Sequence, residues 1–148
     1  MNIKFYQFEK DTHWEWYIQR VPTFWSEDMG GLVCIDEDTG KILAAVLYYG
    51  WTQNICEMAV AIDNPMVIRH QFFERAFGFP FERNGKKAVI AMINSQNAKA
   101  INLVKKLGFS FIHSLEEGYG ENQDILTFHL KREDCKYVNN LEEMKEAS

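Results

Sequence analysis

The sequence predicts a single α/β domain in which six to seven strands form a central sheet flanked by helices. Three observations support this fold class. Apolar residues alternate along some stretches and recur at helical spacing along others, so strands and helices follow one another through the chain. Residues 86–109 combine a strand, a polar loop and an amphipathic helix. Hydrophobic residues make up 47% of the 148 residues, which is enough for a substantial core.

Residues 86–109 give the clearest local prediction. The run 88–93 is apolar throughout and rich in β-branched residues, which predicts a strand covered on both faces. Possible helix caps follow at 94–97, and Gly108 can end a helix in the left-handed conformation. Between them, the expected buried positions recur at helical spacing: Ala100, Ile101, Leu103, Val104 and Leu107.

The N-terminal third predicts a strand, one or two helices and a hairpin. Alternation over residues 1–9 indicates the first strand. Asp11 or Thr12 can cap an aromatic-rich helix, and a second helical turn is an alternative for residues 23–29. Two strand-like runs joined by a polar turn then predict a hairpin, at 32–36 and 41–49.

Residues 54–63 predict a strand whose two faces differ. One face carries Cys56, Met58, Val60 and Ile62, and the other carries Glu57, Ala59 and Ala61. The first face is bulky enough for a core. The second pairs a carboxylate with two small side chains, which leaves room for a ligand.

A further helix and a closing pair of strands complete the expected fold. Asn64 and Pro65 suit a helix start, and Gly78 and Pro80 should weaken that helix near its end. Its expected buried residues are Val67 or Ile68, Phe72, Phe73, Ala76 and Phe77. Residues 109–115 and 124–130 predict an antiparallel pair joined by a loop at 118–120.

Composition excludes several classes of function. A net charge of -5 and a pI near 5.4 argue against a nucleic-acid partner. The three cysteines have no metal-ligand spacing, so we expect neither a metal site nor a disulfide scaffold. No segment approaches the ~20 apolar residues of a spanning helix, so we expect a cytoplasmic protein that binds no membrane. Residues 1–138 should form the domain, and residues 139–148 a flexible polar tail.

Residues 97–109 also carry a family resemblance. Their positions Asn97, Ala100, Leu103, Leu107, Gly108 and Phe109 match the segment N-x-x-A-I-x-L-Y-x-K-L-G-F of the GCN5-related N-acetyltransferase (GNAT) family. Val104 stands where that family usually has tyrosine. The expected order of elements also resembles the GNAT fold, which implies a mixed, mostly antiparallel sheet with a splay between its fourth and fifth strands. Residues 77–81 and 123–135 resemble GNAT-type proteins of bacteriophages and prophages.

The resemblance implies a binding site for acetyl-CoA in that splay. Its cofactor-binding residues would be Val60, Ala61, Ile62, Arg69, His70 and Asn97. The pyrophosphate would lie at the helix start after Pro65, where free N–H groups favour anions. Residues 65–70 lack the glycines of the usual family loop. Arg69 and His70 then either supply donors or are ordinary surface residues.

Glu57 is the candidate catalytic residue. Residues 56–60 resemble the fourth strand of histone-type GNAT enzymes, in which a glutamate acts as general base through water; the alternative is an exposed strand glutamate. With Val104 in place of the family's tyrosine acid, Tyr119, His113 or water could donate the proton. Trp25 and Tyr119 are the candidate substrate-binding residues, although aromatic residues such as those near Trp25 are more often core.

Two functions follow from these patterns. The first is an acetyl-CoA-dependent N-acetyltransferase that transfers an acetyl group to an amine of a protein or small molecule by direct attack. The alternative is a catalytically inactive GNAT-like phage protein that acts as a binding or virion-associated module, so the expected location is the cytoplasm, the host cytoplasm or the virion. The aromatic content of 14% allows a homodimer.

Overall fold

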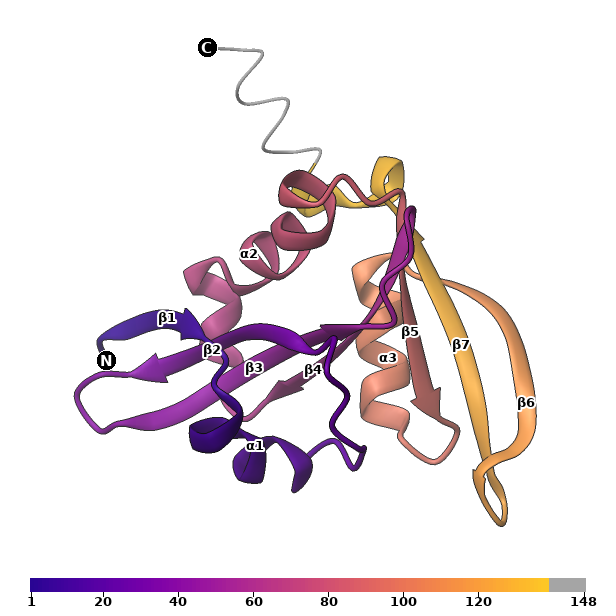
Figure 1. Ribbon diagram of the computed structural model, residues 1–148, viewed down its shortest axis with the longest axis horizontal. Helices are drawn as coiled ribbons and strands as arrows, with labels where there is room; N and C mark the ends of the chain where they lie inside the picture. The colour runs from indigo at the N-terminus through magenta and orange to yellow at the C-terminus, as the bar shows by residue number, and fades with distance from the viewer. Residues whose placement is uncertain (139–148) are drawn as a thin grey trace.

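A computed structural model describes residues 1–138 of the chain, so the predicted tail at 139–148 lies outside the described residues. Within this range, seven strands form one sheet in the order β1-β2-β3-β4-β5-β7-β6 (Figure 1). The strands are β1 (Ile3–Gln7), β2 (Gly30–Asp36), β3 (Lys41–Tyr49), β4 (Ile55–Ile62), β5 (Ala88–Asn94), β6 (Ser110–Gly120) and β7 (Gln123–Lys131). The α-helices are α1 (Lys10–Ile18), α2 (Phe72–Gly78) and α3 (Ala98–Leu107).

The sheet is mixed, and β4 and β5 form its parallel pair. Adjacent strands pair antiparallel elsewhere in the described chain. Parallel strands need a long crossover, and residues 63–87 supply it through α2. The predicted α/β fold class, with a mixed and mostly antiparallel sheet, is confirmed.

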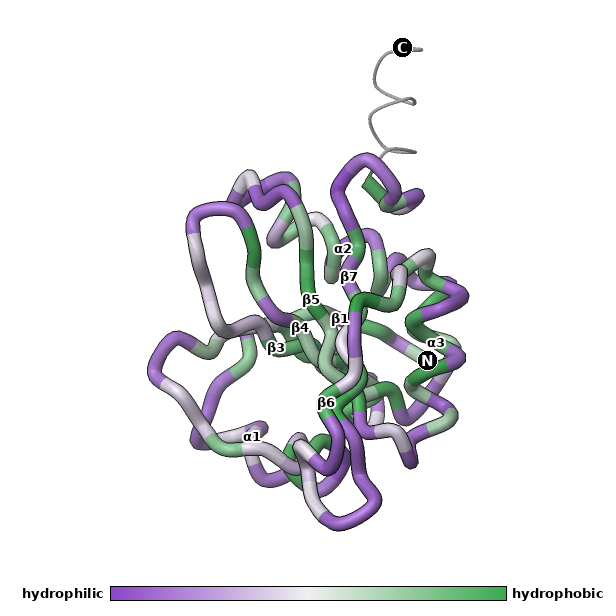
Figure 2. Tube along the Cα trace, turned by 90° about the vertical axis from the view of Figure 1, so that its right-hand side faces the viewer, coloured by the Kyte–Doolittle hydropathy of each residue, from purple (hydrophilic) through white to green (hydrophobic). Residues whose placement is uncertain are grey.

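Helices cover the two faces of the sheet differently. The buried residues of α2 and α3 join the larger cluster of the core, which includes Phe73, Phe77 and Val104. Tyr17 of α1 packs on the opposite face in a smaller cluster with Ala45 and Leu47. Figure 2 shows the hydrophobic residues concentrated along the central strands and the hydrophilic residues along the loops, as expected for a layered domain.

The start of α1 differs from the sequence prediction. The helix begins at Lys10, with Glu9 as its N-cap, so neither Asp11 nor Thr12 caps it. The backbone N–H of Glu9 instead donates to His13 Nδ1 at 2.8 Å. His13 therefore reaches back to the cap as a glutamate does in a capping box, a role that the sequence reading overlooked.

Two further predictions in the N-terminal third are corrected. Residues 23–29 contain no helical turn, and the chain there runs as an irregular connection between α1 and β2. The strand predicted at 32–36 begins earlier, because β2 includes the glycines at 30 and 31. A β-carbon at Gly31 would overlap the carbonyl of Val46 on β3, so close strand contact requires glycine at this position.

The helix predicted after β4 is divided in two. Asn64 Oδ1 accepts from the N–H of Met66, and Pro65 begins the 3-10 helix η1 (Pro65–His70), which confirms the predicted start. Gln71 then adopts the left-handed conformation with φ 68, which separates η1 from α2. Val67 is buried and Ile68 is exposed, which resolves the alternative between them.

The C-terminal half carries one more correction. A π-helical turn, η2 (Phe79–Arg83), continues from α2 through Pro80. Tyr119 belongs to β6, which extends to Gly120, so the connection to β7 is shorter than the predicted loop at 118–120. In the part of the chain that the structure describes, no helix is long and apolar enough to cross a membrane.

Candidate functional site

The main feature of the site is the separation of β4 from β5. Among residues 1–138 the two strands pair at three positions, Ile55 with Ala88, Cys56 with Val89 and Glu57 with Ile90. Beyond them, β4 remains paired with β3 as far as Ile62, and β5 remains paired with β7 as far as Asn94. Each strand therefore keeps one partner and presents its other backbone edge to the gap.

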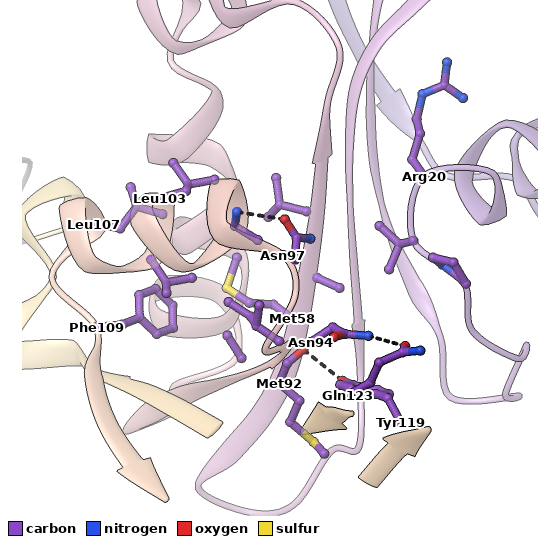
Figure 3. Close-up of a pocket in the computed structure, with 18 of the residues that line it drawn as sticks. Arg20, Met58, Met92, Asn94, Asn97, Leu103, Leu107, Phe109, Tyr119 and Gln123 are labelled. Carbon is purple, nitrogen blue, oxygen red and sulfur yellow. Dashed lines mark hydrogen bonds between the residues drawn. The ribbon is translucent and has the colours of Figure 1, made fainter. Parts of the chain in front are cut away.

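A cavity of about 350 Å³ lies in this gap (Figure 3). Its lining comes from both faces of the sheet, with Leu103 and Val104 of α3 on one side and Val21 and Pro22 after α1 on the other. The lining is mostly apolar, with polar side chains from Arg20, Asn94, Asn97, Tyr119 and Gln123. Pockets of this volume and composition are typical of small-molecule sites.

Asn97 lies on the α3 side of the cavity and caps that helix. Its Oδ1 accepts from the N–H of Ala100 at 3.1 Å (Figure 3). The amide nitrogen of the same side chain is a donor that a ligand can use. At the other end of α3, Gly108 adopts φ 98, as predicted for the helix stop.

Glu57 lies on β4 immediately before Met58, the first β4 residue of the cavity wall. Its side chain is half-buried, and burial raises the pKa of its carboxyl, with a further contribution from the charge of Asp28. Asp28 is held nearby, because its Oδ2 accepts from the N–H of Gly50 at 2.7 Å. A carboxylate with a raised pKa is a stronger proton acceptor than an ordinary glutamate.

Tyr119 reaches the cavity from β6. Its hydroxyl donates to the carbonyl of Met92 on β5 at 3.1 Å (Figure 3). Burial raises the pKa of Tyr119, and the charge of Glu57 raises it further. The structure thus brings the candidate base and this phenol into one electrostatic environment, although they are 62 residues apart in sequence.

Arg20 lines the cavity on the side of α1. Its guanidinium donates from Nε and Nη2 to the two carboxylate oxygens of Asp63, each at 2.7 Å. The same group donates to the carbonyl of Trp16 and lies 4.1 Å from the centre of its ring. These contacts fasten the end of α1 to the residue that follows β4.

The remaining candidate residues lie in different surroundings. Val60 lines the cavity, whereas Ala61 is buried in the smaller cluster with Tyr17. Ile62 packs beside the larger cluster. Arg69 and His70 are exposed on η1, outside the lining. Trp25 is partly buried, and its ring meets that of Trp14 edge-on at 5.3 Å.

Several lining residues were not anticipated from the sequence. Asn94 at the end of β5 and Gln123 at the start of β7 are joined by a hydrogen bond of 2.9 Å between their side chains (Figure 3). Nothing in the sequence around Arg20 indicates that this residue takes part in a binding site. Only the meeting of α1, β5 and β7 around the splay identifies these three side chains as part of a site.

The parallel β4–β5 pair that separates within a helix-flanked, seven-stranded sheet defines a GNAT fold. Solved structures share it. Spermidine/spermine N-acetyltransferase SpeG from Vibrio cholerae superposes with a TM-score of 0.72 at 14% sequence identity, over 94% of this chain and 96% of that chain. A putative acetyltransferase from Acinetobacter baylyi ADP1 gives a TM-score of 0.63 at 13% identity, over 89% and 93%. No protein-family model and no curated protein sequence matches this chain.

Proposed function

We propose that this protein is an acetyl-CoA-dependent N-acetyltransferase that transfers an acetyl group directly to an amine. The observation that carries the proposal is the cavity between β4 and β5, which residues from both faces of the sheet line together. A donor and an acceptor that approach from opposite faces can meet there. Direct transfer needs this contact, because holding two reactants in place removes most of the entropic cost of their encounter.

The residues of the gap fit the donor in two respects. The edge of β4 beyond Glu57 has no strand partner on the β5 side within the described chain, so its backbone groups can bond the amides of a pantetheine arm. Val60 and the apolar residues of α3 would contact the methylene groups of the arm, and Asn97 would donate to it. When bound, acetyl-CoA supplies an acetyl thioester whose thiol is a good leaving group.

The phosphates would lie near η1. Arg69 and His70 in its last turn are exposed cations or potential cations that can pair with them. The side chains of Met66 and Ile68 are exposed on the same 3-10 helix, where the GNAT fold usually carries a glycine loop. Charge pairing by side chains would then take the place of close contact with backbone amides.

Glu57 would accept the proton of the amine. An amine of pKa ~10 is mostly protonated at neutral pH and cannot attack until it loses that proton. Glu57 is suited to the task because burial and Asp28 raise its pKa. Asp28 also places a second negative charge on this side, which favours a cationic amine over a neutral one.

The acceptor class follows from this charge arrangement. SpeG is named for spermidine and spermine, which are small polyamines. We propose an amine-bearing small molecule or protein as the acceptor of this chain and the cytoplasm, or a phage host's cytoplasm, as its location. A polyamine panel and a set of lysine peptides would separate the two kinds of acceptor.

Cofactor binding tests the proposal most directly. A ligand at 100 times its Kd stabilises the native state by ~2.7 kcal/mol, so acetyl-CoA should raise the melting temperature clearly. Glu57→Gln should keep that shift and lower acetyl transfer, whereas Glu37→Gln, an exposed control, should change neither. If neither acetyl-CoA nor CoA shifts the wild-type melting temperature, the enzyme proposal is wrong and a non-catalytic binding module is the better description.

A further inference from the structure

Residues 1–138 supply the cavity with one candidate for a proton donor. Of the described residues that line it, Tyr119 alone carries an ionisable O–H group. The amides of Asn94, Asn97 and Gln123 do not ionise, and the guanidinium of Arg20 is engaged with Asp63 and the carbonyl of Trp16. Val104, which faces the cavity from α3, is an aliphatic side chain with no proton to give.

The position of Tyr119 is fixed by β5. The hydrogen bond from its hydroxyl to Met92 O places the O–H group beside the part of β5 that has left β4. Met92 pairs with Thr127 on β7, so its carbonyl is anchored by the sheet. Rotation about the phenolic C–O bond would turn the proton from this carbonyl toward a ligand in the gap.

Other proton donors near the gap are less suitable. His113 lies on the same strand as Tyr119, but it does not line the cavity. Cys56 is buried in the larger cluster, and burial raises the pKa of its thiol to about 12. Tyr119 remains protonated at neutral pH, because burial and the charge of Glu57 both raise its pKa.

We propose that Tyr119 donates a proton to the sulfur atom of the departing thiol, a role that rests on the proposed acetyl transfer. The amine nitrogen forms a bond to the acetyl carbon, and the carbon–sulfur bond breaks with its electron pair on sulfur. The Tyr119 O–H proton passes to sulfur and gives the free thiol. Glu57 takes the proton of the amine, and the phenolate regains a proton from solvent.

Binding measurements test this role without turnover. Dissociation constants are measured at pH 9, where the thiol is largely ionised, for CoA and for the CoA analogue that lacks the sulfur atom. Tyr119→Phe should weaken CoA binding about tenfold, as expected for loss of a hydrogen bond to a charged group. It should leave binding of the analogue within about twofold. Tyr6→Phe, an exposed tyrosine on β1, is the matched control.

The leaving group provides an independent kinetic test. Tyr119→Phe should lower kcat with acetyl-CoA by about 10² to 10⁴, the usual contribution of general acid catalysis. An acetyl thioester of an acidic aryl thiol should largely remove that deficit, because its thiolate leaves without a proton. A structural role would depress both donors equally. Equal losses of kcat with the two acetyl donors, or equal weakening of the binding of CoA and its analogue, would overturn the role of Tyr119 but not the proposed function. Absence of any CoA binding by the wild type would overturn both.

Discussion

The carboxylate of Glu57 lies directly over Gly50. A β-carbon at Gly50 would overlap Glu57 Oε2, and Gly50 itself adopts φ 60, in the left-handed region. The N–H of Gly50 donates to Asp28, the residue whose charge raises the pKa of Glu57. The glycine therefore both makes room for the candidate base and holds the neighbouring carboxylate in place.

Gly50→Ala should impair both stability and acetyl transfer. The left-handed backbone costs an alanine ~1 kcal/mol, and the displaced Glu57 carboxylate should lower kcat. Urea unfolding and turnover measure the two effects. Gly85→Ala is a matched control, because Gly85 has the same φ of 60 but nothing within 4 Å of its β-carbon position. Gly85→Ala should lower the free energy of unfolding by a similar amount and leave kcat unchanged. Equal kcat values in the two variants would mean that the Gly50 contact does not position Glu57.

Glu57→Gln should stabilise the fold at neutral pH. The native pKa of Glu57 is raised, so between its ordinary and native pKa values the native state binds more protons than the unfolded state. The free energy of unfolding therefore falls as pH rises through that window, and the penalty persists above it. Urea unfolding should show a gain for the variant at pH 7 that shrinks as pH falls and disappears below the ordinary value. A gain that does not depend on pH would contradict this origin.

Substitutions at Asn97 should separate its two roles. Asn97→Ala removes the cap on Ala100 N–H and should cost ~1 kcal/mol of stability. Asn97→Asp keeps the capping oxygen and loses the amide donor, so stability should be retained while CoA affinity falls. Urea unfolding and calorimetric titration measure these effects, with Asn102→Ala on the exposed face of α3 as control. If Asn97→Asp binds CoA as tightly as the wild type, Asn97 is a structural residue only.

The ion pair between Arg20 and Asp63 should contribute modestly to stability. Its bidentate geometry favours a measurable interaction, although both side chains are partly exposed, at 31% and 40%. A double-mutant cycle with alanine at both positions should give a coupling energy of ~0.5–1 kcal/mol that decreases with added salt. Urea unfolding at low and high ionic strength is the measurement, and zero coupling at low salt would show that this ion pair does not help to hold α1 on the sheet.

The local elements of this protein are encoded in short stretches of its sequence. The apolar spacing that ends at Gly108, a cap within residues 94–97 and the start at Pro65 could be predicted because each depends on neighbours within a turn or two. The predicted start of the strand at 32–36 was wrong where a distant contact overrode a local signal, because Gly31 belongs to β2 and permits its close contact with β3.

Only the tertiary structure decided how the site is assembled. Alternation along β4 divided its residues correctly between two faces, but it could not show that Ala61 is buried in the cluster of Tyr17 while Val60 borders a cavity. The same holds for Tyr119, which the sequence placed in a loop and the sheet placed beside Met92. Sequence periodicity reports which side of an element is buried, whereas lateral pairing and splay depend on residues far apart in the chain, which meet only when the whole sheet has formed.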